Sequence, residues 1–164
     1  MVARWLAIAA LACSCDAFSA AVEESELCIP REIAMPGIDA DELVTLHVEF
    51  PLELALPEVM TTDVETMVKF RELRVTAVDG VGDMAFVHEL ELMIRTASLP
   101  YVQITEGAAR YESGTLVVSG LPFDISRYVF ANSARVSARI EADFPPDDWT
   151  AQVKFCFAIR LTYH

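Results

Sequence analysis

Lysine, histidine and glycine are scarce in this chain of 164 residues, which has two lysines (Lys69 and Lys154), three histidines and six glycines. Its 12 basic residues face 25 acidic ones, so the net charge is −13. The chain therefore lacks a basic stripe for phosphate groups, which argues against nucleic acid as a partner. It also lacks a polybasic segment that could hold an anionic membrane surface.

The common catalytic and metal-binding motifs are missing as well. The sequence has no Gly-x-Ser-x-Gly segment and no glycine-rich phosphate loop. No two of its histidines, His47, His88 and His164, stand at the spacing of metal ligands. We therefore expect a protein that is not an enzyme and has no cofactor. The enzymatic alternative is a hydrolase acting through carboxylates, because such groups are recognised by their separation in space rather than by a motif.

The first 15 residues have the pattern of a secretory signal peptide. Met1–Arg4 is a short, positively charged start, and Trp5–Ala12 is an apolar run too short to span a bilayer. Residues 16–27 are small, polar and acidic, and they lack the periodicity of a core-forming segment. We interpret 16–27 as a flexible linker between the signal and the folded domain.

Small residues stand just before Cys13 and Cys15, and this pattern resembles the lipobox of bacterial lipoproteins. In that family the cysteine is lipidated and becomes the first residue of the mature chain. The match is partial, because alanine stands three residues before each cysteine where the family prefers leucine. We predict lipidation of Cys13 or Cys15, and thus attachment to a membrane through lipid. Plain secretion after cleavage behind Ser19 or Ala21 is the alternative.

The other two cysteines, Cys28 and Cys156, lie at opposite ends of the expected domain. In an exported protein such a pair predicts a disulfide bond. The bond would close a loop of about 128 residues, and closing such a loop stabilises a fold by about 4–5 kcal/mol at most. Two separate buried thiols are the alternative. A metal site is not expected, because neither cysteine has another cysteine or a histidine at ligand spacing.

Apolar and polar residues alternate through most of residues 28–164, which is typical of strands with one face in a core. We predict a single all-β domain, an antiparallel β-sandwich of about seven or eight strands, immunoglobulin-like or Greek-key in type. One irregular helical turn is expected within 123–132. The expected strands cover residues 44–56, 68–78, 90–94, 101–105, 116–119, 134–144 and 151–163.

Two strands carry further local signals. Pro51 cannot donate to a sheet ladder, so its strand is either an edge strand or two strands meeting at a bend. Within 68–78 the apolar residues change parity, which predicts a β-bulge near Arg71-Glu72.

The C-terminal third has the clearest alternation. The runs 134–144 and 151–163, joined by Pro145–Asp148, are predicted to pair as a long antiparallel hairpin. Cys156 shares the parity of the charged residues Lys154 and Arg160, so its side chain should point away from the core.

Some loops and aromatic residues are candidates for binding. Asp-rich loops on a sandwich can hold calcium, and the chain has the clusters Asp39–Glu42 and Asp147-Asp148, although ordinary turn residues explain both. Aromatic side chains near loops could stack on a sugar or a partner, or could pack in the core; these are Trp149, Tyr101, Tyr111 and Tyr128.

The stretch Val68–Ile104, followed by Ile125–Tyr128 and the strand Arg-Val-Ser-Ala-Arg-Ile-Glu-Ala, resembles uncharacterised β-rich lipoproteins of bacterial envelopes, including myxobacterial ones. The resemblance implies a sandwich on a lipid anchor and no activity. We therefore expect an exported, non-catalytic envelope lipoprotein of the outer membrane or periplasm, with a structural or binding role toward another envelope protein or a glycan. The alternatives are a secreted calcium-dependent adhesion or carbohydrate-binding module and the carboxylate-based hydrolase.

Overall fold

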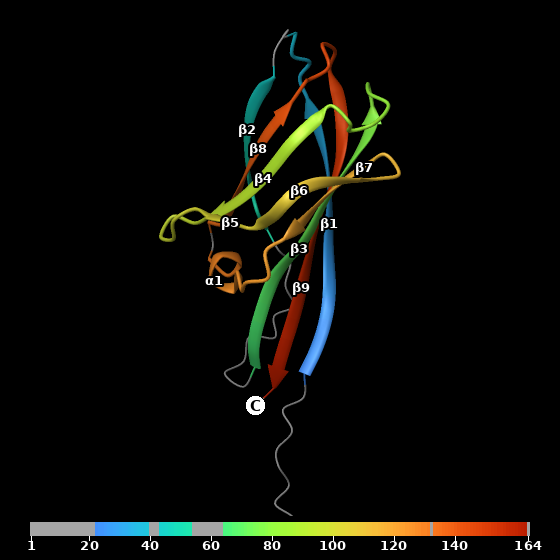
Figure 1. Ribbon diagram of the computed structural model, residues 1–164. Coiled ribbons are helices and arrows are strands. Elements are labelled where there is room, and N and C mark those ends of the chain that lie inside the picture. The colour runs from blue at the N-terminus through green and yellow to red at the C-terminus, as the bar shows by residue number, and fades with distance from the viewer. Residues whose placement is uncertain (1–21, 40–42, 54–63, 132, 164) are drawn as a thin grey trace, which may run out of the picture.

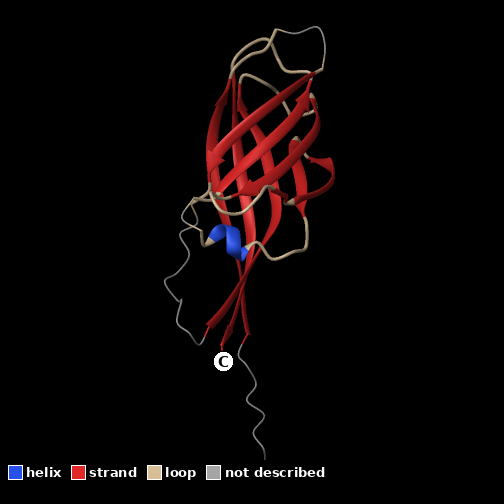
Figure 2. Ribbon diagram, turned by 90° about the vertical axis from the view of Figure 1, so that its left-hand side faces the viewer, coloured by secondary structure: helices blue, strands red, loops and turns tan. Residues whose placement is uncertain are grey.

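The computed structural model describes residues 22–39, 43–53, 64–131 and 133–163 (Figure 1). The strands form two antiparallel sheets that stack face to face, which confirms the predicted all-β sandwich (Figure 2). No helix in this part of the chain is long and apolar enough to cross a membrane. The elements are β1 (Val22–Met35), β2 (Val44–Pro51), β3 (Val64–Asp79), β4 (Val87–Arg95), β5 (Val102–Gln103), β6 (Thr105–Glu112), β7 (Thr115–Gly120), α1 (Ser126–Val129), β8 (Arg135–Ala142) and β9 (Trp149–Tyr163).

The strand order is that of a jelly roll. One sheet has the order β1-β9-β3-β7-β6 and the other β2-β8-β4-β5. The first strand thus pairs with the last, β2 pairs with β8, and β3 pairs with β7. Jelly rolls are built from Greek keys, so the Greek-key alternative is confirmed. The immunoglobulin-like alternative is wrong, because there the first strand lies beside the second in the order ABED.

The predicted hairpin of the C-terminal third is wrong. β8 pairs with β2 and β4, whereas β9 pairs with β1 and β3 in the opposite sheet. The connection between them therefore crosses the sandwich. Alternation reports which face of a strand is buried and carries no information about its partner. Pro145 and Pro146 lack backbone N–H groups and do not fit the two-residue turns that close tight hairpins.

The domain begins earlier than its predicted start at residue 28. β1 starts at Val22, so residues 22–27 of the predicted linker belong to a strand that pairs with β9 along its whole length. Most of these side chains are exposed, so the segment lacks an apolar period, and its backbone pairing holds it in place. Residues 16–21 and the predicted signal peptide, 1–15, lie outside the described residues, as do Cys13 and Cys15.

Three local predictions are confirmed. The register between β3 and β9 shifts between Phe70 and Glu72, which is the bulge expected there. Pro51 ends β2, which is an edge strand. The helical turn is α1, and its Ser126 hydroxyl oxygen accepts a hydrogen bond from the buried Val68 N–H at 2.9 Å, which fixes the turn against β3.

The core lies between the two sheets. Phe50 from β2 and Phe155 from β9 meet across it, with ring centroids 5.1 Å apart. Beyond this core, β1, β3 and β9 continue as a narrow three-stranded ribbon that projects past the other sheet (Figures 1 and 2). The described N-terminal end of β1 lies at the tip of this ribbon, so the segment that precedes the domain leaves from there.

Candidate functional site

The first and last strands are joined by a disulfide bond between Cys28 and Cys156. The two residues are directly opposite in the register between β1 and β9, and their Cα atoms are 4.1 Å apart. Cys156 is 2 % exposed, yet it stands apart from the core cluster to which its neighbours Phe155 and Phe157 belong. This agrees with the prediction that Cys156 points outward from the core.

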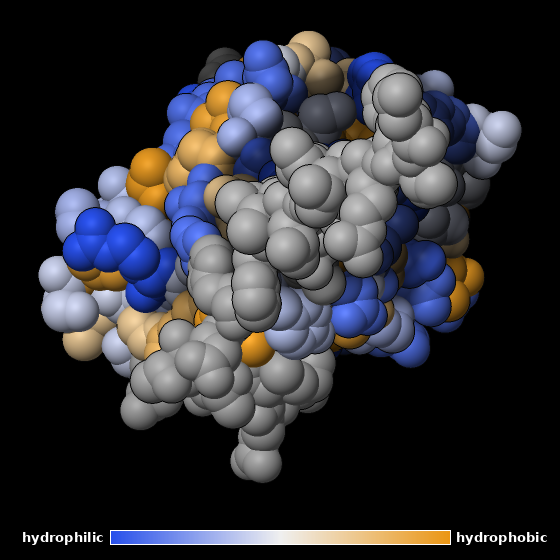
Figure 3. All heavy atoms as spheres, turned by 90° about the horizontal axis from the view of Figure 1, so that it is seen from below, coloured by the Kyte–Doolittle hydropathy of each residue, from blue (hydrophilic) through white to orange (hydrophobic). Residues whose placement is uncertain are grey.

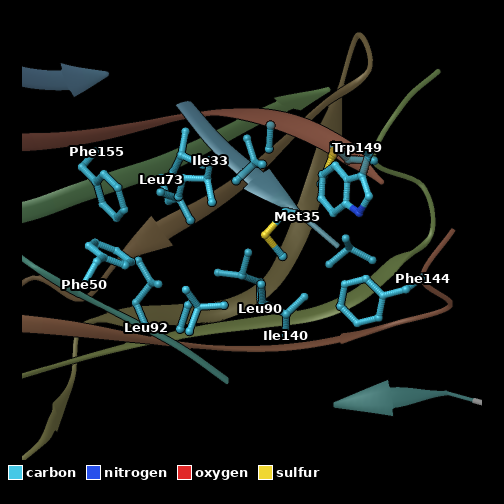
Figure 4. Close-up of a pocket in the computed structure, with 17 residues that line it drawn as sticks. Ile33, Met35, Phe50, Leu73, Leu90, Leu92, Ile140, Phe144, Trp149 and Phe155 are labelled. Carbon is cyan, nitrogen blue, oxygen red and sulfur yellow. The ribbon is translucent and has the colours of Figure 1, made fainter. Parts of the chain in front are cut away.

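An apolar cavity of about 50 Å³ lies between the sheets, lined by seventeen side chains (Figure 4). The lining is entirely apolar, with Leu73 and Phe155 on one side and Leu90 and Leu92 on the other. An engineered apolar cavity that binds benzene measures about 150 Å³. The space is therefore too small for a sugar or an acyl chain. None of its lining side chains could transfer a proton or attack a substrate.

Trp149 packs at one end of this cavity. It is 5 % exposed, and its ring meets the ring of Phe86 edge-on, with centroids 5.1 Å apart and planes at 84°. Within the described residues the indole Nε1 has no hydrogen-bond partner. Trp149 is thus a core residue and not a platform for a sugar, since its faces are covered.

The other candidate aromatic residues also have intramolecular contacts. The guanidinium carbon of Arg95 lies 5.1 Å from the centroid of the Tyr101 ring. The Tyr111 hydroxyl donates to the carbonyl oxygen of Val87 in the other sheet, and desolvation raises the pKa of this phenol. Tyr128 packs against the core. Core packing therefore describes Tyr128, whereas Tyr111 is 47 % exposed and held by its hydrogen bond to the other sheet.

The Asp147-Asp148 turn has a structural contact. Asp148 Oδ1 accepts a hydrogen bond of 2.8 Å from the backbone N–H of Gly37, which ties this turn to the segment after β1. Residues 40–42 of the Asp39–Glu42 cluster lie outside the described residues. In the part of the chain that is described, the one group of three potential metal ligands is Glu26, Cys28 and Cys156, and its two sulfurs are bonded to each other.

The outer face of the four-stranded sheet is crossed by ion pairs. Glu49 Oε1 lies 2.7 Å from Arg95 Nη2 and 2.8 Å from Arg135 Nε. The hydrogen bond from Arg95 lowers the pKa of the Glu49 carboxyl below its usual value. Arg139 contacts Glu89, Glu91 and Glu141, and the charge of Glu141 raises the pKa of the Arg139 guanidinium. The arginines of this face are thus neutralised by carboxylates of the same sheet.

The histidines are not brought together. His47 is exposed on β2. His88 belongs to β4, and its Nε2 lies 2.6 Å from Asp143 Oδ2. His164 lies outside the described residues. Seen from the ribbon end, the coloured surface is mostly hydrophilic with separate hydrophobic spots (Figure 3).

No protein-family model and no curated protein matches the chain. Among solved structures, the chain is similar to the BFDV capsid protein in a decameric assembly, at 10% identity and a TM-score of 0.47, covering 86% of this chain and 99% of that one. The BFDV capsid protein in a 60-mer gives 8% identity and a TM-score of 0.44, with coverage of 88% and 95%. These similarities are too distant to carry a functional argument.

Proposed function

We propose that the protein is an exported, non-catalytic binding module of the cell envelope, attached to a membrane through lipid on Cys13 or Cys15. The observation that carries the proposal is the disulfide between Cys28 and Cys156. Disulfides form and persist in oxidising compartments outside the cytoplasm. The bond supports export independently of the signal-like sequence of residues 1–15.

The position of β1 sets how the domain would sit on a membrane. Only residues 16–21 separate Cys15 from the start of the strand at Val22. Fully extended, this segment reaches at most about 25 Å. A lipidated cysteine would thus hold the ribbon tip near the bilayer. The outer faces of both sheets would then remain open to a glycan or to another envelope protein.

The apolar interior favours binding over catalysis. The cavity between the sheets is lined by carbon and sulfur side chains and by the indole of Trp149, with no carboxylate among them. Ligand binding by the folded domain would therefore take place on its outer surface.

Membrane fractionation tests the proposal. The full chain, produced in a bacterium, should sediment with membranes and be released by detergent but not by high salt. Replacing Cys13 and Cys15 together with serine should release it, whereas the matched pair Cys28→Ser and Cys156→Ser should leave it attached. Attachment that survives loss of both Cys13 and Cys15, or retention in the cytoplasm, would overturn the proposal.

A further inference from the structure

The two outer faces of the sandwich differ in how many of their basic side chains are paired with carboxylates. On the four-stranded sheet Arg95, Arg135 and Arg139 are all in ion pairs. On the five-stranded sheet, among the described residues, ion pairs involve Arg74 and Arg160 but none of the other basic side chains, which are Arg31, Lys69, Arg71, Arg110 and Lys154. A chain with 25 acidic residues thus leaves a group of cations without carboxylate partners on one face.

Three of these cations line a single hollow. Lys69, Arg71 and Arg110 border a space of about 470 Å³ on the outer face of the five-stranded sheet. Its floor includes Gly120, where an added Cβ would lie 2.0 Å from the carbonyl oxygen of Phe70. The missing side chain at Gly120 therefore lets β7 approach β3 closely at the base of the hollow.

Two strand irregularities place the arginines there. Arg71 is the extra residue of the bulge in β3, and Arg110 resumes the register of β6 with β7 after a shift that begins at Glu106. Bulges re-aim side chains relative to the regular pleat. The hydroxyl of Ser119 on β7 then accepts a hydrogen bond of 3.1 Å from Arg110 Nη2, which holds this guanidinium over the hollow.

Three carboxylates stand nearby and oppose an anion to different degrees. Glu72 is occupied by Arg74, whose Nε lies 2.5 Å away, and this hydrogen bond raises the pKa of the Arg74 guanidinium. Glu106 faces Ser119 across the strand pair without lining the hollow. Glu26 borders the hollow; its Oε1 lies 3.8 Å from Cys28 Sγ, which is disulfide-bonded and has no proton to donate.

A second, smaller hollow extends the first. It measures about 160 Å³, shares Lys69 and Arg71, and continues over Ala158 toward Arg160. Glu24 also lines this second hollow, and its Oε1 lies 3.8 Å from Arg160 Nε. The small side chain of Ala158 lies between Glu26 and Lys69 in the register, which leaves the sheet surface low at that point. Because the two spaces share Lys69 and Arg71, they form one groove, which is bordered by these cations and Arg110 and also by the carboxylates of Glu24, Glu26 and Glu72.

We propose that this groove binds the oxyanion groups, carboxylate or sulfate, of an acidic glycan. Guanidinium groups bind two oxygens of one oxyanion through paired hydrogen bonds, and Lys69 adds a point charge. The spread of Lys69, Arg71 and Arg110 along the groove favours a chain with repeated acidic groups over a free ion. The inference deepens the proposed binding role and names its ligand class, but it does not depend on the lipid anchor.

Calorimetry on the full-length, disulfide-bonded protein tests this site with three probes: an oligogalacturonate, a neutral oligosaccharide of similar length and inorganic phosphate. The oligogalacturonate should bind saturably and the neutral sugar should not. Loss of one charged hydrogen bond in Arg71→Gln or Arg110→Gln should weaken binding about tenfold. Lys154→Gln removes the same charge from the same face outside the hollow and should change affinity less than about twofold. Glu26→Gln should tighten binding, because it removes an opposing charge.

The outcomes separate this inference from the proposed function. Absence of oligogalacturonate binding by the membrane-attached protein would overturn the groove and leave the anchor intact. Equal weakening by Lys154→Gln and Arg71→Gln would also overturn it, since binding would then follow net charge alone. Phosphate binding without any gain from the oligosaccharide would overturn the glycan assignment.

Discussion

Cys28 and Cys156 lie directly opposite each other in the ladder between β1 and β9, and so join the first and last strands of the jelly roll. The loop that the bond closes spans 128 residues. A bond at this place restrains the unfolded chain strongly and also holds the edge strand β1 against β9.

Removing this bond should destabilise the domain. We expect the paired change Cys28→Ala and Cys156→Ala to lower the free energy of unfolding by about 2–5 kcal/mol. Urea denaturation followed by tryptophan fluorescence measures the loss, and the wild-type protein with reductant is the matched control. A loss of less than about 0.5 kcal/mol, the usual range of surface substitutions, would mean that the bond does not constrain the fold.

Gly120 should tolerate no side chain. Its added Cβ would lie 2.0 Å from the Phe70 carbonyl oxygen, so Gly120→Ala must push β7 away from β3. We expect a cost of about 1–3 kcal/mol in the free energy of unfolding. Gly82→Ala is the control, because an added Cβ there meets no atom within 4 Å. Similar thermal stability of the two variants would contradict the close approach.

The hydroxyl group of Ser126 should stabilise the folded domain. The oxygen accepts the Val68 N–H at 2.9 Å, and its one proton is shared between Asp124 Oδ1 and, at 3.1 Å, the Thr66 carbonyl oxygen. Ser126→Ala leaves the buried Val68 N–H and the partly buried Thr66 carbonyl short of a partner, although Asp124 Oδ1 also accepts the Val68 N–H at 3.2 Å. The expected loss is about 1–3 kcal/mol. In a urea titration the exposed Ser25→Ala should change nothing measurable, and equal effects of the two changes would contradict this role.

The ion pair at Glu49 should give a small dependence of stability on pH. Arg95 lowers the pKa of the Glu49 carboxyl, so the pair stabilises the folded state above the carboxyl's ordinary pKa. That contribution is lost as the pH falls through the lowered value. In an NMR titration, Arg95→Gln should move the pKa of Glu49 upward, whereas Arg31→Gln on β1 should leave it in place. An unchanged midpoint in Arg95→Gln would contradict the assignment.

Local sequence patterns predicted strands well because burial of one face imposes a period of two. The bulge at Arg71 was visible as a change of parity, and Pro51 marked an edge strand. These patterns could not predict which strands pair, because the same alternation suits any partner strand. For this reason β8 and β9 were predicted, wrongly, to form a hairpin. β6 was missed because all but two of its eight residues are exposed, so both of its faces are polar.

The same distinction, between local sequence patterns and strand pairing, applies to the candidate sites. The disulfide could be predicted because Cys28 and Cys156 are the two cysteines outside the signal region. The groove could not, because Lys69, Arg71 and Arg110 come together only through the register of β3, β7 and β6. The shift in β6 has no sequence signal comparable to the parity change in β3. Gly107, with φ of 71°, is the one local hint of it.

Intact-mass spectrometry of the non-reduced protein from the membrane fraction tests lipid attachment and export in one experiment. We expect a mature chain that begins at Cys13 or Cys15, carries acyl groups on that cysteine, and contains Cys28 and Cys156 in one cross-linked peptide pair after digestion. A chain without acyl mass that begins at Ala20 or Val22 would contradict lipid attachment. Free thiols at both Cys28 and Cys156 in freshly exported protein would contradict the oxidised, exported domain itself.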